Sequence, residues 1–84
     1  MGYFFKSSAL RELKKLPVKA QKRIVGKLDF YTAKSFPLKF ADKLTDHRFG
    51  EWRFRIGEYR VIFDLDTKSR IIVLRVGHRR DVYR

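Results

Sequence analysis

The chain has 84 residues, which is enough for one domain with a single core and too short for two. Hydrophobic residues make up 44% and aromatic residues 15%, so we expect a packed core rather than a disordered chain. Lys and Arg number 21 against 9 Asp and Glu, and the formal charge of +12 favours an anionic partner over the alternative of a soluble protein that is merely basic. Nucleic acid is the first candidate, an acidic protein the second and an anionic membrane surface the third.

Several classes of protein are excluded by what the chain lacks. The absence of cysteine excludes a disulfide framework, a cysteine-ligated zinc site and thiol catalysis. There is no apolar run long enough to span a bilayer and no basic leader before an apolar stretch, so we expect a soluble, cytoplasmic protein without membrane contact. Glycine-rich phosphate loops and paired-histidine spacing are absent too, and we predict neither a cofactor nor a metal.

The first part of the chain predicts a short strand and a helical hairpin. Residues 3–6 are typical of a strand, and Ser7 or Ser8 can cap the helix that follows. Pro17 interrupts that helix and suits the start of a second one, over about 17–33. Four residues at helical spacing form its predicted buried stripe: Ala20, Ile24, Leu28 and Tyr31.

The second part predicts three strands joined by tight turns. Residues 34–50 are expected to be a connection, with one helical turn over 38–44. Gly57 comes first in a two-residue turn of type II′. The predicted strands are 51–56, 59–65 and 70–77, with a tail over 78–84. The expected fold class is α+β: a single domain over 1–84, in the order β-α-α-β-β-β, with the short strand and helical hairpin packed on an antiparallel meander. We expect the helices to cover one face of the sheet and to leave the other free.

Arginines alternate with apolar residues in the first strand of the meander. Arg53 and Arg55 are two residues apart and so share one face, and Arg60 follows just after the turn. Guanidinium groups carry forked donors that match phosphate oxygens, so one interpretation is a cradle for a phosphodiester. The alternative is a solvated sheet face, since surface strands often carry long basic side chains.

Three residues near the C-terminus could contribute to chemistry. His78 and Arg79 follow the last strand, and an imidazole can both take and give a proton near neutral pH. Tyr83 could stack on a nucleobase or touch a phosphate through its hydroxyl. The alternatives are a surface histidine and an aromatic residue that pins the tail to the core.

Two segments together resemble the RelE/ParE superfamily of bacterial and archaeal toxins. They are WRFRIGEYRVIF over 52–63 and VGHRRDVY over 76–83, and the resemblance extends over essentially the whole chain. It points to the RelE-like branch of mRNA interferases. The resemblance implies a toxin of a type II toxin–antitoxin system that enters the ribosomal A site, cuts the message by attack of a 2′-hydroxyl on the adjacent phosphate, and so inhibits translation.

The resemblance also implies site residues. Arg53, Arg55, Arg60, Arg79 and Tyr83 match site positions of the family, and we add His78 to this expected catalytic set. Some members carry lysine where this chain has its first two arginines, and an arginine is a poor general base, so we hypothesise that His78 transfers the proton. Four further basic residues are expected to contact RNA: Lys39, Lys43, Arg48 and Arg80.

The implied partners are the ribosome with its mRNA and an acidic, RelB-like antitoxin, with a toxin–antitoxin heterotetramer as one expected assembly. Three alternatives stay open. The chain could be a ParE-like inhibitor of DNA gyrase, a basic RNA-binding module without catalysis, or a folded but inactive toxin.

Overall fold

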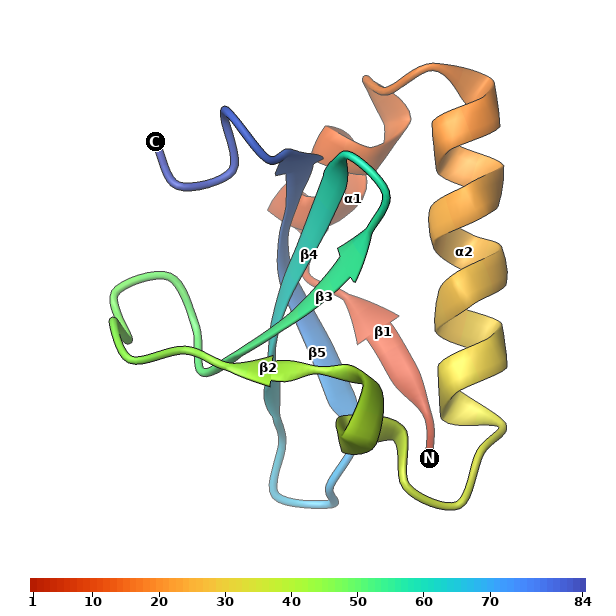
Figure 1. Cartoon of the computed structure of the whole chain (residues 1–84), viewed down its shortest axis with the longest axis vertical. Helices are drawn as coiled ribbons and strands as arrows, with labels where there is room; N and C mark the ends of the chain where they lie inside the picture. Colours follow the sequence, from red (N-terminus) through yellow and green to blue (C-terminus); the bar gives the residue numbers. More distant parts are fainter.

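A five-stranded sheet carries two helices on one of its faces in the structure, a computed structural model that describes all 84 residues (Figure 1). The elements are β1 (Tyr3–Phe5), α1 (Ser7–Lys14), α2 (Val18–Thr32), the 3₁₀ turn η1 (Pro37–Phe40), β2 (Asp42–Lys43), β3 (Trp52–Ile56), β4 (Tyr59–Leu65) and β5 (Ile71–His78). The strand order is β1-β5-β4-β3-β2. Only the β1–β5 pair is parallel. The predicted α+β class and element order are therefore confirmed. Neither helix is long and apolar enough to cross a bilayer.

The two helices begin differently from the expectation of a serine cap. Lys6, not Ser7 or Ser8, is the N-cap of α1, and no side chain caps the helix. The reason is that Lys6 N still donates to the carbonyl of Val73, so the chain passes from the β1–β5 pairing directly into the first helical turn. Pro17 is the N-cap of α2 in an extended conformation. Because proline has no N–H to donate, α1 and α2 are separate helices.

The core lies between the helices and one face of the sheet. The predicted stripe of α2 is confirmed, since Ala20, Ile24, Leu28 and Tyr31 are all buried. The ring of Tyr31 stacks on Phe54 of β3 with centroids 4.6 Å apart, and Phe54 stacks in turn on Phe63 of β4 at 4.5 Å. Apolar area removed from water in this aromatic stack is a main source of the fold's stability.

The hairpin between β3 and β4 follows the sequence pattern. Phe54 and Ile56 are buried while Arg55 between them is exposed, which confirms the predicted alternation. Gly57 has a φ of +58° and Glu58 keeps a negative φ, as the predicted type II′ turn requires. The turn fixes the register that places Arg55 of β3 opposite Arg60 of β4.

The face away from the helices is not bare, contrary to expectation. Two residues of the predicted connection, Asp42 and Lys43, form the edge strand β2 on β3. Ile62 on this face is completely buried, because the backbone passes over it at Gly50: a Cβ added there would lie 2.6 Å from Ile62. The segment before β3 and the C-terminal tail border this face (Figure 1). Because no helix covers it, we call the face away from the helices the open face.

An irregularity in β5 decides which side chains reach the open face. Ile62 pairs with Arg75 and Phe63 with Val73, which leaves Leu74 as an extra residue. Strict alternation from Ile71 and Val73 would turn Arg75 into the core. The bulge moves Arg75 to the open face and returns Val76 to the core, where it is buried.

Candidate functional site

Three arginines of β3 and β4 share the open face of the sheet. Arg53 and Arg55 alternate with buried Phe54, and Arg55 lies directly opposite Arg60 in the β3–β4 pairing. Like charges directly opposite on neighbouring strands are destabilising. The fold therefore maintains a repulsive pair on this face.

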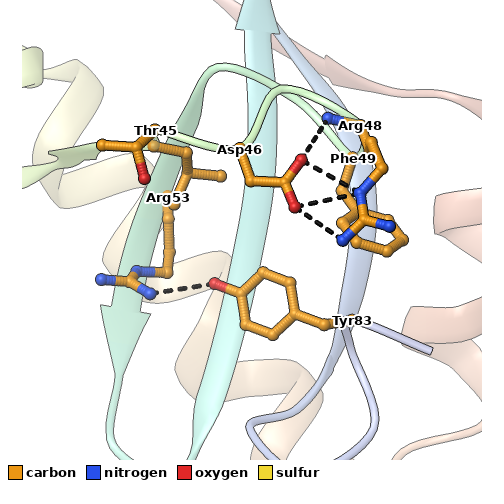
Figure 2. Close-up of a pocket in the computed structure, with 7 residues that line it drawn as sticks. Thr45, Asp46, Arg48, Phe49, Arg53 and Tyr83 are labelled. Carbon is orange, nitrogen blue, oxygen red and sulfur yellow. Dashed lines mark hydrogen bonds and ion pairs between the residues drawn. The ribbon is translucent and has the colours of Figure 1, made fainter.

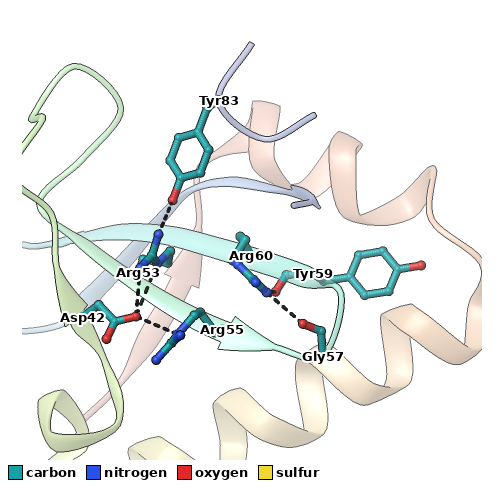
Figure 3. A network of polar contacts seen from close by, with 7 residues as sticks. All are labelled: Asp42, Arg53, Arg55, Gly57, Tyr59, Arg60 and Tyr83. Carbon is teal, nitrogen blue, oxygen red and sulfur yellow. Dashed lines mark hydrogen bonds and ion pairs between the residues drawn. The ribbon is translucent and has the colours of Figure 1, made fainter. Parts of the chain in front are cut away.

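An aspartate that the sequence analysis did not single out lies against two of these arginines. Asp42 pairs with Arg53 across β2 and β3. Its Oδ2 atom accepts from Arg53 Nη2 at 3.1 Å and Arg53 Nε at 3.4 Å, and it lies 2.9 Å from Arg55 Nε (Figure 3). Two guanidinium groups thus converge on one anionic oxygen atom, which is the arrangement a phosphate oxygen would need.

Arg60 has no acidic partner. Its Nη1 atom donates to the carbonyls of Gly57 at 2.8 Å and Tyr59 at 2.9 Å (Figure 3). Burial lowers the pKa of Arg60 below its ordinary value, and the positive charges of Arg53 and Arg55 lower it further. An anion placed here would offset this repulsion.

Tyr83 reaches the same group of side chains from the C-terminal tail. Its hydroxyl accepts from Arg53 Nη1 at 2.9 Å (Figures 2 and 3). Burial by itself would lower the pKa of Arg53, but the hydrogen bonds to Tyr83 and Asp42 outweigh it, and the pKa is raised. We call Arg53, Arg55, Arg60 and Tyr83 the arginine cluster.

His78 and Arg79 lie outside the arginine cluster, at the end of the sheet where β3 turns into β4. His78 pairs with Tyr59, so its side chain lies on the helix-covered side, at the end of the sheet. Its ring meets that of Tyr59 edge-to-face at 5.9 Å, and its Nδ1 atom accepts from the backbone N–H of Arg80. Arg79 Nε lies 2.8 Å from Glu58 at the β3–β4 turn. The charge of Arg79 is close enough to depress the pKa of Arg60, although less than burial and the two β3 arginines do.

The four residues expected to contact RNA are dispersed over the surface. Lys39 is exposed on η1, and Lys43 Nζ lies 5.4 Å from the centre of the Trp52 ring. Arg80 is exposed in the tail. Arg48 forms an ion pair with Asp46 at 2.7 Å, and both border a cavity of about 240 Å³ beside the arginine cluster (Figure 2). The whole lining of this cavity is Leu44, Thr45, Asp46, Arg48, Phe49, Arg53 and Tyr83.

Asp42 and Arg75 shape the site but were not predicted from the sequence, each for a different reason. Asp42 lies on a two-residue strand, which is too short to produce a periodic pattern. Arg75 lies after the bulge, so the alternation of its own strand predicts the wrong face. Groups of three or more potential metal ligands do not occur in the structure.

Comparison with known proteins identifies the family of the chain. A family model described as the ParE toxin of the type II toxin–antitoxin system parDE matches residues 3–83. Toxin RelG of Mycobacterium tuberculosis is 32% identical over 81 residues, which covers 95% of this chain and 92% of RelG. The crystal structure of the toxin–antitoxin complex RelBE2 from M. tuberculosis contains a chain that superposes with a TM-score of 0.74 at 29% identity. That match covers 93% of this chain and 96% of the other.

The family match spans nearly the full chain, and the structural match extends over the helices and the sheet alike. The chain therefore belongs to the ParE toxin family of type II toxin–antitoxin systems, within the RelE/ParE superfamily.

Proposed function

We propose that this toxin is an endoribonuclease that cuts mRNA in the ribosomal A site and so inhibits translation. The 2′-hydroxyl of one nucleotide loses its proton and attacks the adjacent phosphate. The bond from phosphorus to the 5′ oxygen of the next nucleotide breaks, and that oxygen takes up a proton, so that a 2′,3′-cyclic phosphate and a 5′-hydroxyl result. The observation that carries the proposal is the convergence of Arg53 and Arg55 on a single carboxylate oxygen of Asp42, with Arg60 unpaired by any acid beside them.

The arginine cluster supplies charge stabilisation in this proposal. Negative charge builds on the phosphate oxygens as the attacking oxygen approaches, and preorganised guanidinium donors stabilise that charge without reorganising. Arginine stays protonated at physiological pH, so none of the three is a general base. The hydroxyl of Tyr83 accepts a hydrogen bond from Arg53 Nη1, and its ring is available to stack on a neighbouring base.

Proton transfer has no obvious carrier within the cluster. His78 lies on the other side of the sheet, so we leave it out of the proposed chemistry of the free chain. A site without a general base depends on substrate geometry, and a ribosome that holds the message near in-line attack would supply it. The formal charge of +12 supports ribosome binding through phosphate contacts, which are strongly salt-dependent.

We also propose an acidic antitoxin as the partner that silences the toxin. The matched structure is that of a toxin–antitoxin complex, and the charge of this chain suits an acidic segment laid over it. In this proposal, an acidic side chain of the antitoxin would replace the Asp42 carboxylate between Arg53 and Arg55, as a phosphate of the substrate would.

The experiment uses purified toxin with ribosomes programmed with a defined message. We expect cleavage within the A-site codon, fragments with a 5′-hydroxyl, and little cutting of the same RNA without ribosomes. Intact message on toxin-saturated ribosomes would refute the proposal.

Inhibition of DNA gyrase is the second candidate, and it is favoured by the description of the matching family as ParE toxins. A supercoiling assay with purified gyrase separates the two functions. The endoribonuclease proposal predicts undiminished supercoiling in the presence of the toxin. Loss of supercoiling together with intact message would assign the chain to the gyrase-inhibiting branch.

A further inference from the structure

Arg75 of β5 is a half-buried guanidinium group for which the proposed chemistry has no use. No Asp or Glu side chain pairs with it. Its Nη1 atom donates to the carbonyl of Val82 at 3.0 Å, and its Nη2 atom donates to the main-chain oxygen of Arg84 at 2.7 Å. These two oxygen atoms belong to the residues immediately before and after Tyr83. Arg75 therefore donates hydrogen bonds to the backbone on both sides of Tyr83.

The guanidinium of Arg75 is also connected to Tyr83 through the ring of Phe49. It lies over Phe49 at 4.7 Å from the ring centre, and Phe49 meets the ring of Tyr83 edge-to-face at 5.8 Å. Phe49 belongs to the segment that borders the open face, and both aromatic residues line the cavity beside the cluster (Figure 2). Arg75 thus joins the tail and that segment at the point where Tyr83 reaches Arg53.

The other contacts that fix the position of Tyr83 are local to the tail. Asp81 N and Val82 N donate to His78 O, Arg84 N donates to Asp81 O, and Val82 is buried against Gly77. These contacts hold the backbone on either side of Tyr83 but leave its own ring partly exposed. Its hydroxyl has one partner, Arg53.

We propose that Arg75 is a positioning residue that holds Tyr83 in hydrogen-bond contact with Arg53. Its effect on cleavage rests on the proposed function, whereas its effect on the tyrosine does not. The role needs an arginine: a planar fork can span two main-chain oxygen atoms while its face lies on an aromatic ring, and a compact lysine ammonium cannot do both at once.

The chain contains a matched control. Arg70 also lies over a phenylalanine, Phe4, at 5.2 Å, and it is held by Asp66 at 2.7 Å in the β4–β5 turn. Arg75→Ala, Arg75→Lys and Arg70→Ala are compared with wild type for melting temperature and for single-turnover cleavage on programmed ribosomes.

We expect both Arg75 variants to lower the cleavage rate at saturating ribosomes about ten- to a hundredfold, because small displacements of aligned groups have effects of this size. The half-saturating ribosome concentration should not change, and Arg70→Ala should cleave as wild type does. Wild-type rates in both Arg75 variants would overturn the positioning role.

A double-variant comparison separates positioning from general loss of structure. If Arg75 acts through Tyr83, adding Arg75→Ala to Tyr83→Ala lowers the rate no further. A further drop as large as that in the wild-type background would show that Arg75 acts independently of Tyr83 and would overturn the proposal.

Nuclear magnetic resonance tests the contact without any activity. We expect the cross-peak between the Phe49 and Tyr83 rings to be lost in Arg75→Lys and kept in Arg70→Ala. If wild type does not cut message, the proposed function fails, but this cross-peak still decides the role of Arg75. Its persistence in both Arg75 variants would refute the positioning role.

Discussion

The two faces of the sheet are built on opposite principles. The helix-covered face is apolar and aromatic, and its central stack of Tyr31, Phe54 and Phe63 removes apolar area from water. The open face holds arginines directly opposite one another, Arg55 against Arg60, with one aspartate among them. The first face contributes stability, while the second gives up stability for a concentration of positive charge.

In so small a chain, the functional side chains lie on the face of the sheet that does not pack against the helices. Only one face of the sheet is needed to hold the helices, so the other is free to carry side chains that do not suit a fold. Charges that repel in the free toxin become favourable when an anion lies between them.

The core face should dominate stability. Phe54→Ala removes a fully buried ring from the centre of the stack, and we expect it to lower the free energy of unfolding by about 3–5 kcal/mol. Arg55→Ala on the same strand should change it by no more than about 0.5 kcal/mol. Chemical denaturation measures both, and losses of equal size would break the comparison between the faces.

The open face should dominate activity. Arg60→Gln keeps a donor for the carbonyls of Gly57 and Tyr59 but removes the charge, and we expect cleavage on programmed ribosomes to fall about 10²- to 10³-fold. Arg11→Gln, on exposed α1, is the matched control and should cleave normally. Equal rates for the two variants would mean that charge at position 60 is not part of the site.

Alkaline pH should weaken the attachment of β1 to α2. Burial, together with the hydrogen bond to Asp29, raises the pKa of Tyr3 from 10.0 to about 12. A raised pKa stabilises the folded state fully below pH 10, and that stabilisation is lost as pH rises toward 12. Because the hydrogen bond between Tyr3 and Asp29 is exposed to solvent, we expect a loss of at most about 1 kcal/mol relative to Tyr3→Phe, measured by denaturation at pH 9 and pH 12. A parallel pH dependence in both proteins would contradict it.

Asp42 should compete with an incoming phosphate. Asp42→Asn removes the carboxylate that now occupies Arg53 and Arg55, so a short oligonucleotide should bind about two- to tenfold more tightly at low salt. Fluorescence anisotropy at several salt concentrations measures the change. Weaker binding would show that Asp42 orients the arginines more than it blocks them.

The smallest effect is expected at His78. Because its side chain lies away from the arginine cluster, His78→Ala should cut message at nearly the wild-type rate between pH 6 and 8. Single-turnover cleavage across that range measures it. A loss that follows the protonation of an imidazole would return His78 to the mechanism as its proton carrier.

The sequence predicted the fold where patterns are long and regular. The stripe from Ala20 to Tyr31 and the alternation from Trp52 to Ile56 each repeat often enough to identify a helix and a strand. The serine cap was wrong because a hydrogen bond from Lys6 to a distant strand decides where α1 begins. Contacts across the fold leave no local trace in the chain.

The site was predictable only in part for the same reason. Arg53, Arg55 and Arg60 follow from alternation and a two-residue turn, which fix both face and register. Asp42 depends on an edge pairing of two residues, and Arg75 depends on a bulge that reverses the alternation of β5. Both are set by strand pairing rather than by spacing in the sequence.

Primer extension on cellular messages after a short pulse of expression shows whether the arginine cluster cuts RNA in cells. The account predicts new 5′ ends within codons in cells that produce the wild-type toxin, and their absence in cells that produce Arg60→Gln at the same level. Intact messages in the presence of folded wild-type toxin, or identical cleavage by both proteins, would contradict it.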